Sequence, residues 1–282
     1  MQSFAYIDET LDINLTQSYE LSIQLSLNGL SFCLLDTVRN KFIVLKHIQF
    51  QAYSAFDDYL DIIEKAIESN DLLNHEYRKV KLVWISNKNT LIPSSLFNID
   101  NLKTYFEFNQ KLNDLDEIHY TELKYANAYS VFTIPNQIAT IFTRVYSNII
   151  FYNQQTPEIE NALFRYNSNE FKVLIHVEND FFDLIITQKG KLLLYNNFVY
   201  KNEIDMLYYI MYSFEQLKIN PESIDLILSG ILTKNSKEHL KLKEFIRHIR
   251  FEKHSEENSF SYTFNKIAHH HYTNLFNLNI CE

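Results

Sequence analysis

The run His269-His270-His271 is one candidate for chemistry in this sequence, because imidazole is a common ligand of zinc and other transition metals. Consecutive helical residues point about 100° apart and cannot converge on one ion, and on a strand only two of three share a face. No cysteine or carboxylate group lies nearby at ligand spacing. The pattern therefore favours a solvated or half-buried run, and we expect no metal ion here.

A second candidate combines His176 with the carboxylates Glu178, Asp180 and Asp183. The histidine could be a general base or the remnant of a metal-binding position, and the carboxylates could bind a divalent cation. However, His176 lies in a strand-like run and the carboxylates alternate around a tight turn. We expect a histidine satisfied by hydrogen bonds in the core or between lobes, a solvated hairpin, and no catalytic residue.

Glycine is scarce, which removes whole classes of chemistry. Average usage of about 7% would give about 20 glycines, whereas this chain of 282 residues has three, at Gly29, Gly190 and Gly230. Phosphate loops, dinucleotide fingerprints and nucleophile elbows need glycine where the backbone turns sharply or approaches a ligand. The sequence therefore offers no support for a dinucleotide-binding enzyme or a serine hydrolase.

Charge and cysteine content set further bounds. Lysine and arginine total 26 and aspartate and glutamate total 35, so the net charge of −9 repels phosphate backbones and anionic membranes. Cys33 and Cys281 form no disulfide framework. The acidic N-terminus carries no signal-peptide pattern, and the apolar patches are too short to span a bilayer. We expect a cytoplasmic protein without a membrane span or nucleic-acid partner.

The elements around these residues follow one order twice. Residues 20–26, 30–36 and 41–50 predict a three-stranded meander, followed by a helix over 56–67 and a buried strand over 80–86. The same order returns at residues 171–179, 181–188 and 191–200, with a helix opening at Asn202 and a buried strand at 224–230. Lys41 corresponds to Lys191 at an offset of 150. The sequence therefore predicts two related lobes.

The remaining segments complete the predicted domain organisation. The first lobe spans 1–168, with an insertion at about 98–135 whose segments 118–123 and 129–134 predict a hairpin. The second spans 169–282 and adds a helix at 237–248, a strand at 249–253 and a final helix at 263–276. The fold class is α/β, with two lobes built on mixed sheets.

Three antiparallel strands, a helix and a parallel strand, present twice, resemble the ribonuclease H-like lobe doubled in the actin-like ATPase superfamily. Residues 19–36, YELSIQLSLNGLSFCLLD, with the acidic DETL just upstream, resemble the opening of the domain of unknown function 3822 family from Bacteroidetes. The resemblance implies an actin-like fold with lobes of order β-β-β-α-β-α-β-α. It also implies kinship with actin-like proteins of type IV pilus and type II secretion platforms, some of which are peptide-binding scaffolds.

The resemblance also implies where a nucleotide site would lie, between the lobes on two hairpins of the form Asp-x-Gly-x-Thr/Ser. The first hairpin keeps glycine and serines but has no aspartate, and the second has histidine for aspartate and glutamate for glycine. A bulky anionic side chain at that position repels phosphate. One glycine remains of the pair that supports adenosine. The degenerate site comprises Asn28, Gly29, Ser31, His176, Glu178, Ser229 and Gly230.

We therefore expect a catalytically silent actin-like scaffold without a cofactor, whose interlobe cleft or inserted segment 102–135 binds a protein or peptide partner. The alternative is a divergent protein that binds ATP with Mg in an altered pose. In that case, Gly230→Val should abolish ligand binding and leave the fold intact. A monomer or weak homodimer is expected, and pairing of open strand edges offers a third role, as a structural oligomer.

Overall fold

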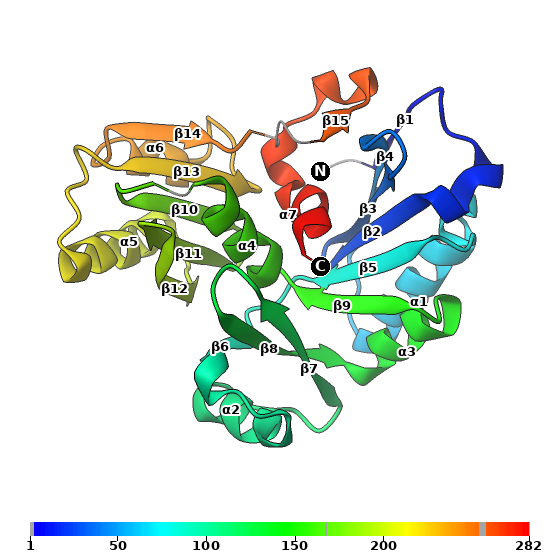
Figure 1. Cartoon of the computed structure of the whole chain (residues 1–282), viewed down its shortest axis with the longest axis horizontal. Coiled ribbons are helices and arrows are strands. Elements are labelled where there is room, and N and C mark those ends of the chain that lie inside the picture. The colour runs from blue at the N-terminus through cyan, green and yellow to red at the C-terminus, as the bar shows by residue number, and fades with distance from the viewer. Residues whose placement is uncertain (1–2, 167, 254–257, 282) are drawn as a thin grey trace.

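The computed structural model describes residues 3–166, 168–253 and 258–281, which form two lobes, each built on a mixed sheet (Figure 1). The first sheet has seven strands in the order β1-β4-β3-β2-β5-β9, and β15 also pairs with β4. Its strands are β1 (Phe4–Ile7), β2 (Tyr19–Ser26), β3 (Gly29–Asp36), β4 (Lys41–Gln49), β5 (Lys79–Trp84), β9 (Ile149–Asn153) and β15 (Ser259–Phe260).

Two helices cover one face of the first sheet, α1 (Phe56–Glu68) and α3 (Asn136–Val145). The helical spacing of Tyr59, Ile63 and Ile67 places these side chains on one stripe of α1, where they are buried against the sheet. Each large apolar side chain buried in this way contributes about 1.5–3 kcal/mol to folding. The predicted meander, helix and buried strand of this lobe are confirmed.

The C-terminal part of the chain covers the opposite face of the first sheet. Phe264, Leu275 and Phe276 pack there against Cys33 and Phe42. We predicted one helix over 263–276, and this is wrong: the segment forms 3₁₀ turns and the short α7 (Thr273–Asn277). The reason is the extended backbone of Ile267 (φ −99°, ψ 154°), which ends the first turn. The 3₁₀ turns in the described residues are Ile13–Ser18, Asp71–Leu73, Ser94–Leu96, Ile99–Asn101, Tyr262–Lys266, His269–His271 and Leu278–Ile280.

The second sheet has five strands in the order β12-β11-β10-β13-β14. Helices α5 (Glu203–Leu217) and α6 (Lys237–Leu242) pack on one face, and α4 (Gln155–Arg165) packs on the other. In Figure 1, α4 and α7 lie side by side between the two sheets. The strands are β10 (Lys172–Val177), β11 (Phe181–Gln188), β12 (Lys191–Val199), β13 (Asp225–Gly230) and β14 (His248–Phe251).

The register of the two sheets supports the duplication. In the first lobe a β-bulge falls at Ile43, which is skipped between the pairs Leu34–Val44 and Leu35–Phe42. In the second lobe the bulge falls at Leu193, between the pairs Ile186–Leu194 and Thr187–Leu192. Ile43 and Leu193 differ by 150 residues, the offset that the sequence predicts. The repeat therefore extends to an irregularity of the strands and not only to their order.

The inserted segment forms a separate three-stranded sheet in the order β6-β8-β7. Strands β7 (Asp116–Leu123) and β8 (Ala128–Pro135) confirm the predicted hairpin, and β6 (Asn89–Pro93) and α2 (Leu102–Asn109) complete the unit. This sheet begins nearer the N-terminus than the expected insertion, while the division of the chain into domains stays a prediction. No helix in the described ranges is both long enough and apolar enough to span a membrane.

Candidate functional site

A cavity of about 430 Å³ opens between the lobes, where central strands of both sheets end. It brings together most of the positions that sequence reasoning selected, because the hairpin after β2 and the turn after β13 face each other across it. Its lining residues are Gln24, Ser26, Asn28, Gly29, Ser31, His47, Gln49, Glu178, Asn179, Gly230, Ile231, Thr233, His271 and Tyr272. These described residues contain one carboxylate and no lysine, arginine or aspartate.

Polar side chains of the first lobe hold the β2–β3 turn in place. The Tyr59 hydroxyl donates to the Ser26 carbonyl at 2.9 Å, and Gln49 Nε2 donates to the Asn28 carbonyl at 2.8 Å. Gly29 is required by close packing, since a Cβ here would lie 2.7 Å from the Ile48 carbonyl oxygen. Contacts within its own lobe therefore fix the turn.

The hydroxyl of Ser31, a residue of the expected degenerate nucleotide site, contacts a side chain of its own lobe. Its Oγ lies 2.8 Å from Nδ1 of His47, and both side chains are more than nine-tenths buried. Burial lowers the pKa of His47, the largest effect on that ring. A neutral imidazole paired with a serine hydroxyl leaves this wall of the cavity without a positive charge.

Glu178 is the only carboxylate among the described residues of the cavity wall. Its backbone N–H donates to the Phe181 carbonyl at 2.9 Å, and its own carbonyl accepts from the Tyr200 hydroxyl at 3.0 Å. Both main-chain groups are thus used within the second lobe. A phosphate here would meet a carboxylate in place of the amides that normally cradle it.

Gly230 has a structural role that the sequence did not reveal. Its φ is +83°, and a Cβ at this position would lie 2.1 Å from the carbonyl oxygen of Val177, its neighbour on the parallel strand β10. The expectation that Gly230→Val would keep the fold and test ligand binding is therefore wrong. Any side chain at this position collides with the backbone of the central strand.

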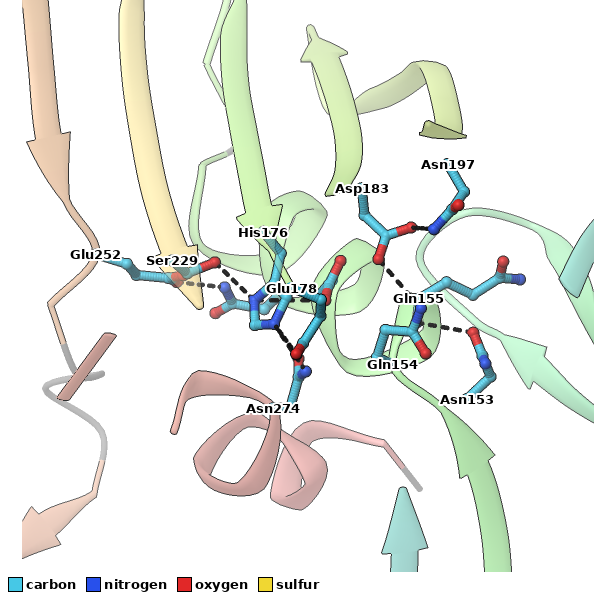
Figure 2. Close-up of polar contacts among 12 residues, drawn as sticks. Asn153, Gln154, Gln155, His176, Glu178, Asp183, Asn197, Ser229, Glu252 and Asn274 are labelled. Carbon is cyan, nitrogen blue, oxygen red and sulfur yellow. Dashed lines mark hydrogen bonds and ion pairs between the residues drawn. The ribbon is translucent and has the colours of Figure 1, made fainter. Parts of the chain in front are cut away.

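His176 and Ser229 lie behind the cavity wall, in the buried core between the lobes (Figure 2). His176 Nδ1 is 2.9 Å from Ser229 Oγ, and Nε2 is 3.1 Å from Glu178 Oε1. The serine, histidine and carboxylate follow the order of a nucleophilic relay, but Ser229 is 5% exposed and His176 is 2% exposed. The interpretation of His176 as a histidine satisfied by hydrogen bonds is confirmed.

Helix α4 between the lobes was missed by the sequence, because its residues are polar and yet buried. Its side chains reach several elements: Gln155 Nε2 donates to Ser130 Oγ at 2.7 Å, and Asn161 Nδ2 donates to Glu252 Oε1 at 2.6 Å. The one sequence signal was the helical spacing of Ile159, Ala162 and Leu163, interrupted by polar residues. This helix joins the inserted sheet and the second lobe through hydrogen bonds.

The carboxyl groups of Glu158 and Asp183, close to His176, are buried. Burial, and then the charges of Asp183 and Glu178, raise the pKa of Glu158 well above its ordinary range. Burial also raises the pKa of Asp183, although Asn197 and Gln154 donate to this carboxyl group (Figure 2), as does the Tyr195 hydroxyl. The expectation of a solvated hairpin is wrong for Glu178 and Asp183, which are buried. The described residues contain no group of three or more histidine, cysteine and carboxylate side chains that could hold a metal ion.

The run His269–His271 is half-buried, as expected, and forms a 3₁₀ turn. His270 Nε2 and His271 Nε2 lie 2.9 Å and 3.3 Å from the same Leu232 carbonyl oxygen. Burial, and then the neighbouring His270, lower the pKa of His271 to about 4. Two of the three rings are therefore occupied in holding the C-terminal segment on the second lobe.

The sequence matches the family described as Protein of unknown function (DUF3822) over residues 8–249. The chain belongs to this family. This DUF3822 protein is similar in structure to a Bacteroides thetaiotaomicron protein with an actin-like ATPase fold and unknown function. The two are 26% identical, with a TM-score of 0.78, over 86% of this chain and 94% of that chain. No curated protein matches the sequence.

Two more distant structures share the fold of this DUF3822 protein. A chain of the PilM-PilN type IV pilus biogenesis complex is 9% identical, with a TM-score of 0.62, over 94% of this chain and 99% of that chain. The ethanolamine utilization protein EutJ from Carboxydothermus hydrogenoformans is 7% identical, with a TM-score of 0.51, over 98% of this chain and 93% of that chain. The predicted actin-like ATPase fold is confirmed.

Proposed function

We propose that this DUF3822 protein is a catalytically silent actin-like scaffold that binds a protein or peptide partner. The observation that carries the proposal is the charge of the interlobe cavity, whose described wall presents Glu178 and no cation or aspartate. ATP chemistry needs cations or amides aimed at the phosphates and carboxylates that hold Mg²⁺. The described cavity wall supplies no lysine or arginine for the phosphates, and its one carboxylate, Glu178, occupies the position at which the hairpin pattern has glycine.

Two further observations support the proposal. The positions that would serve a nucleotide are used for internal contacts: Ser31 binds His47, and Gly230 packs against Val177. In addition, the similar chain from the PilM-PilN complex was solved with another protein, so a chain with this fold does take part in a protein complex. The alternative of divergent ATP binding has one point in favour, because Asn28, Gly29 and Gly230 do line a single cavity.

Calorimetric titration with Mg-ATP separates the two functions. The scaffold function predicts no measurable heat of binding and no ATP turnover at nucleotide concentrations up to about 1 mM. A Kd of about 1 mM corresponds to a binding free energy of about −4 kcal/mol. Micromolar binding with release of phosphate would overturn it. Glu178→Gln is the matched variant, since it keeps the shape of the wall and removes one negative charge; weak nucleotide binding gained only by this variant identifies charge as the barrier.

A further inference from the structure

Strand β12 forms an outer edge of the second sheet, and no strand of the described part of the chain pairs with its far side (Figure 1). Two hydrogen bonds fix which of its main-chain groups face outward. Glu178 N donates to Phe181 O, and Tyr200 N donates to Asp180 O. Because hydrogen-bonded pairs alternate along antiparallel strands, the main-chain N–H and C=O groups of Tyr200, Phe198 and Asn196 point toward β11. The N–H and C=O groups of Tyr195, Asn197 and Val199 therefore point away from the sheet.

The first lobe shows what occupies the equivalent position there. Strand β1 pairs antiparallel with β4, placing Phe4 opposite His47 and Tyr6 opposite Leu45. At the offset of 150, His47 corresponds to Asn197 and Leu45 corresponds to Tyr195. The same strand position is thus filled by an extended segment in one lobe and unpaired in the other.

The unpaired half of β12 also lacks the devices that usually protect a sheet edge. Charges, prolines and bulges are the common ones. The first half of the strand has Lys191 and the bulge at Leu193, and the opposite edge of the sheet, β14, presents Arg250 in an ion pair with Asp225. The stretch Tyr195–Val199 has none of them, so it is suited to pairing.

A groove of about 590 Å³ separates this edge from the inserted unit, and its chemistry matches a peptide backbone. Asn87, Asn89, Asn109 and Gln110 line the facing wall. Asn89, Asn109 and Gln110 donate to neighbouring residues, and Asn89 Oδ1 accepts from the Tyr195 hydroxyl at 3.2 Å. Among the described residues, none is seen donating to the carboxamide oxygens of Asn109 and Gln110, which can accept from a peptide N–H. None of the described lining residues is lysine, arginine, aspartate or glutamate. A charged segment would lose hydration here without gaining an ion pair, so a neutral segment fits.

We propose that β12 binds an extended, uncharged segment of a partner protein as an added strand, using the outward main-chain groups of Tyr195, Asn197 and Val199. This inference rests on the proposed function and names its binding surface. Main-chain pairing supplies affinity, and the carboxamide wall selects against charge. The inserted unit faces this edge across the groove.

The test uses the full chain and a phage-displayed library of random linear peptides of about eight residues, a typical strand length. Selected peptides are synthesised, and their affinities are measured by fluorescence anisotropy. Val199→Pro removes an outward N–H from an exposed edge residue, where proline is tolerated in a sheet. Val199→Thr is the matched control, because it changes the side chain and keeps the N–H. Asn109→Lys adds a charge to the opposite wall without touching β12.

We expect uncharged peptides whose affinity falls at least about tenfold, 1.4 kcal/mol, in Val199→Pro and Asn109→Lys, and is unchanged in Val199→Thr. Failure of the library to yield any binder overturns the inference, as does equal binding by Val199→Pro. Peptides that bind equally to all these variants show a protein-binding scaffold with another site, so the proposed function would stand. Concentration-dependent dimerisation that Val199→Pro abolishes would instead identify a second copy as the occupant and also overturn the inference.

Discussion

The two lobes have the same strand order, the same bulge position and the same helix after the third strand. The outer edges of their third strands, β4 and β12, nevertheless have different neighbours. In the first lobe, β4 carries β1 and β15 on its outer side, whereas β12 in the second lobe is bare within the described residues. A duplicated lobe keeps what its core requires. The difference therefore lies where packing does not demand a particular answer, at the sheet edge.

The two turns that face each other across the interlobe cavity also differ, in the backbone conformation of their glycines. Gly29 begins β3 and packs closely against Ile48, while Gly230 ends β13 with a positive φ and packs against Val177. Both glycines lie where a nucleotide would be expected, and both are explained by the backbone around them. The remnants of an ATP site can thus persist for reasons of folding alone.

The largest effect is expected from these glycines. Gly230→Ala should destabilise the protein by about 4 kcal/mol, because it combines a left-handed backbone conformation with a backbone clash. Gly29→Ala meets only the clash and should cost about 2 kcal/mol. Urea unfolding of both variants measures the difference. Equal costs would show that the two turns are equivalent and that the second lobe stores no special strain.

A smaller effect, a dependence of stability on pH, is expected from Glu160 on α4, the helix between the two sheets (Figure 1). Burial raises the pKa of Glu160 on α4 from 4.5 to about 7, and its Oε1 accepts from Tyr125 N at 3.1 Å. The folded chain then keeps a proton that the unfolded chain loses. The contribution of protonated Glu160 to the free energy of unfolding is complete below pH 4.5 and is lost as the pH rises to about 7. The total loss is up to about 3 kcal/mol.

Urea unfolding at pH 5 and pH 7.5 checks this prediction. Glu160→Gln should flatten the pH dependence, and Glu122→Gln, an exposed change on β7, should leave it as in the unchanged chain. The buried Glu158 adds a slope of the same sign. If the free energy of unfolding of the unchanged chain does not vary with pH, the carboxyl groups of α4 are hydrated and titrate as they do in water, which would contradict the prediction.

Much of the fold could be predicted from the sequence, because the meanders and their helices obey simple periodicities. Tyr59, Ile63 and Ile67 recur at helical spacing, and the runs that became β5 and β13 are nearly continuous in apolar residues. Strand β1 was missed because four residues carry too little periodicity. Helix α4 was missed because its polar side chains are buried through hydrogen bonds with other elements, which only the tertiary structure supplies.

The candidate site was predictable only in part. The hairpin positions Asn28, Gly29 and Glu178 do reach one cavity, since equivalent strands end at equivalent places in the two lobes. His176 and Ser229 are paired on β10 and β13 one position before these strands end, so they lie deeper between the lobes than Glu178 and Gly230. That depth depends on how the two lobes pack, which no local pattern records. The β12 groove was also missed, because its wall comes from an insertion whose placement no local pattern records.

Residue-resolved amide hydrogen exchange by NMR tests the central difference between the lobes most directly. Leu45 and His47 lie opposite β1, and their equivalents Tyr195 and Asn197 have the same orientation without a partner strand among the described residues. We predict that the amides of Tyr195 and Asn197 exchange at least about a hundredfold faster, since unpaired amides need no opening of structure. Equal protection of the two pairs would contradict the account, because it would show that the edge of β12 is already covered.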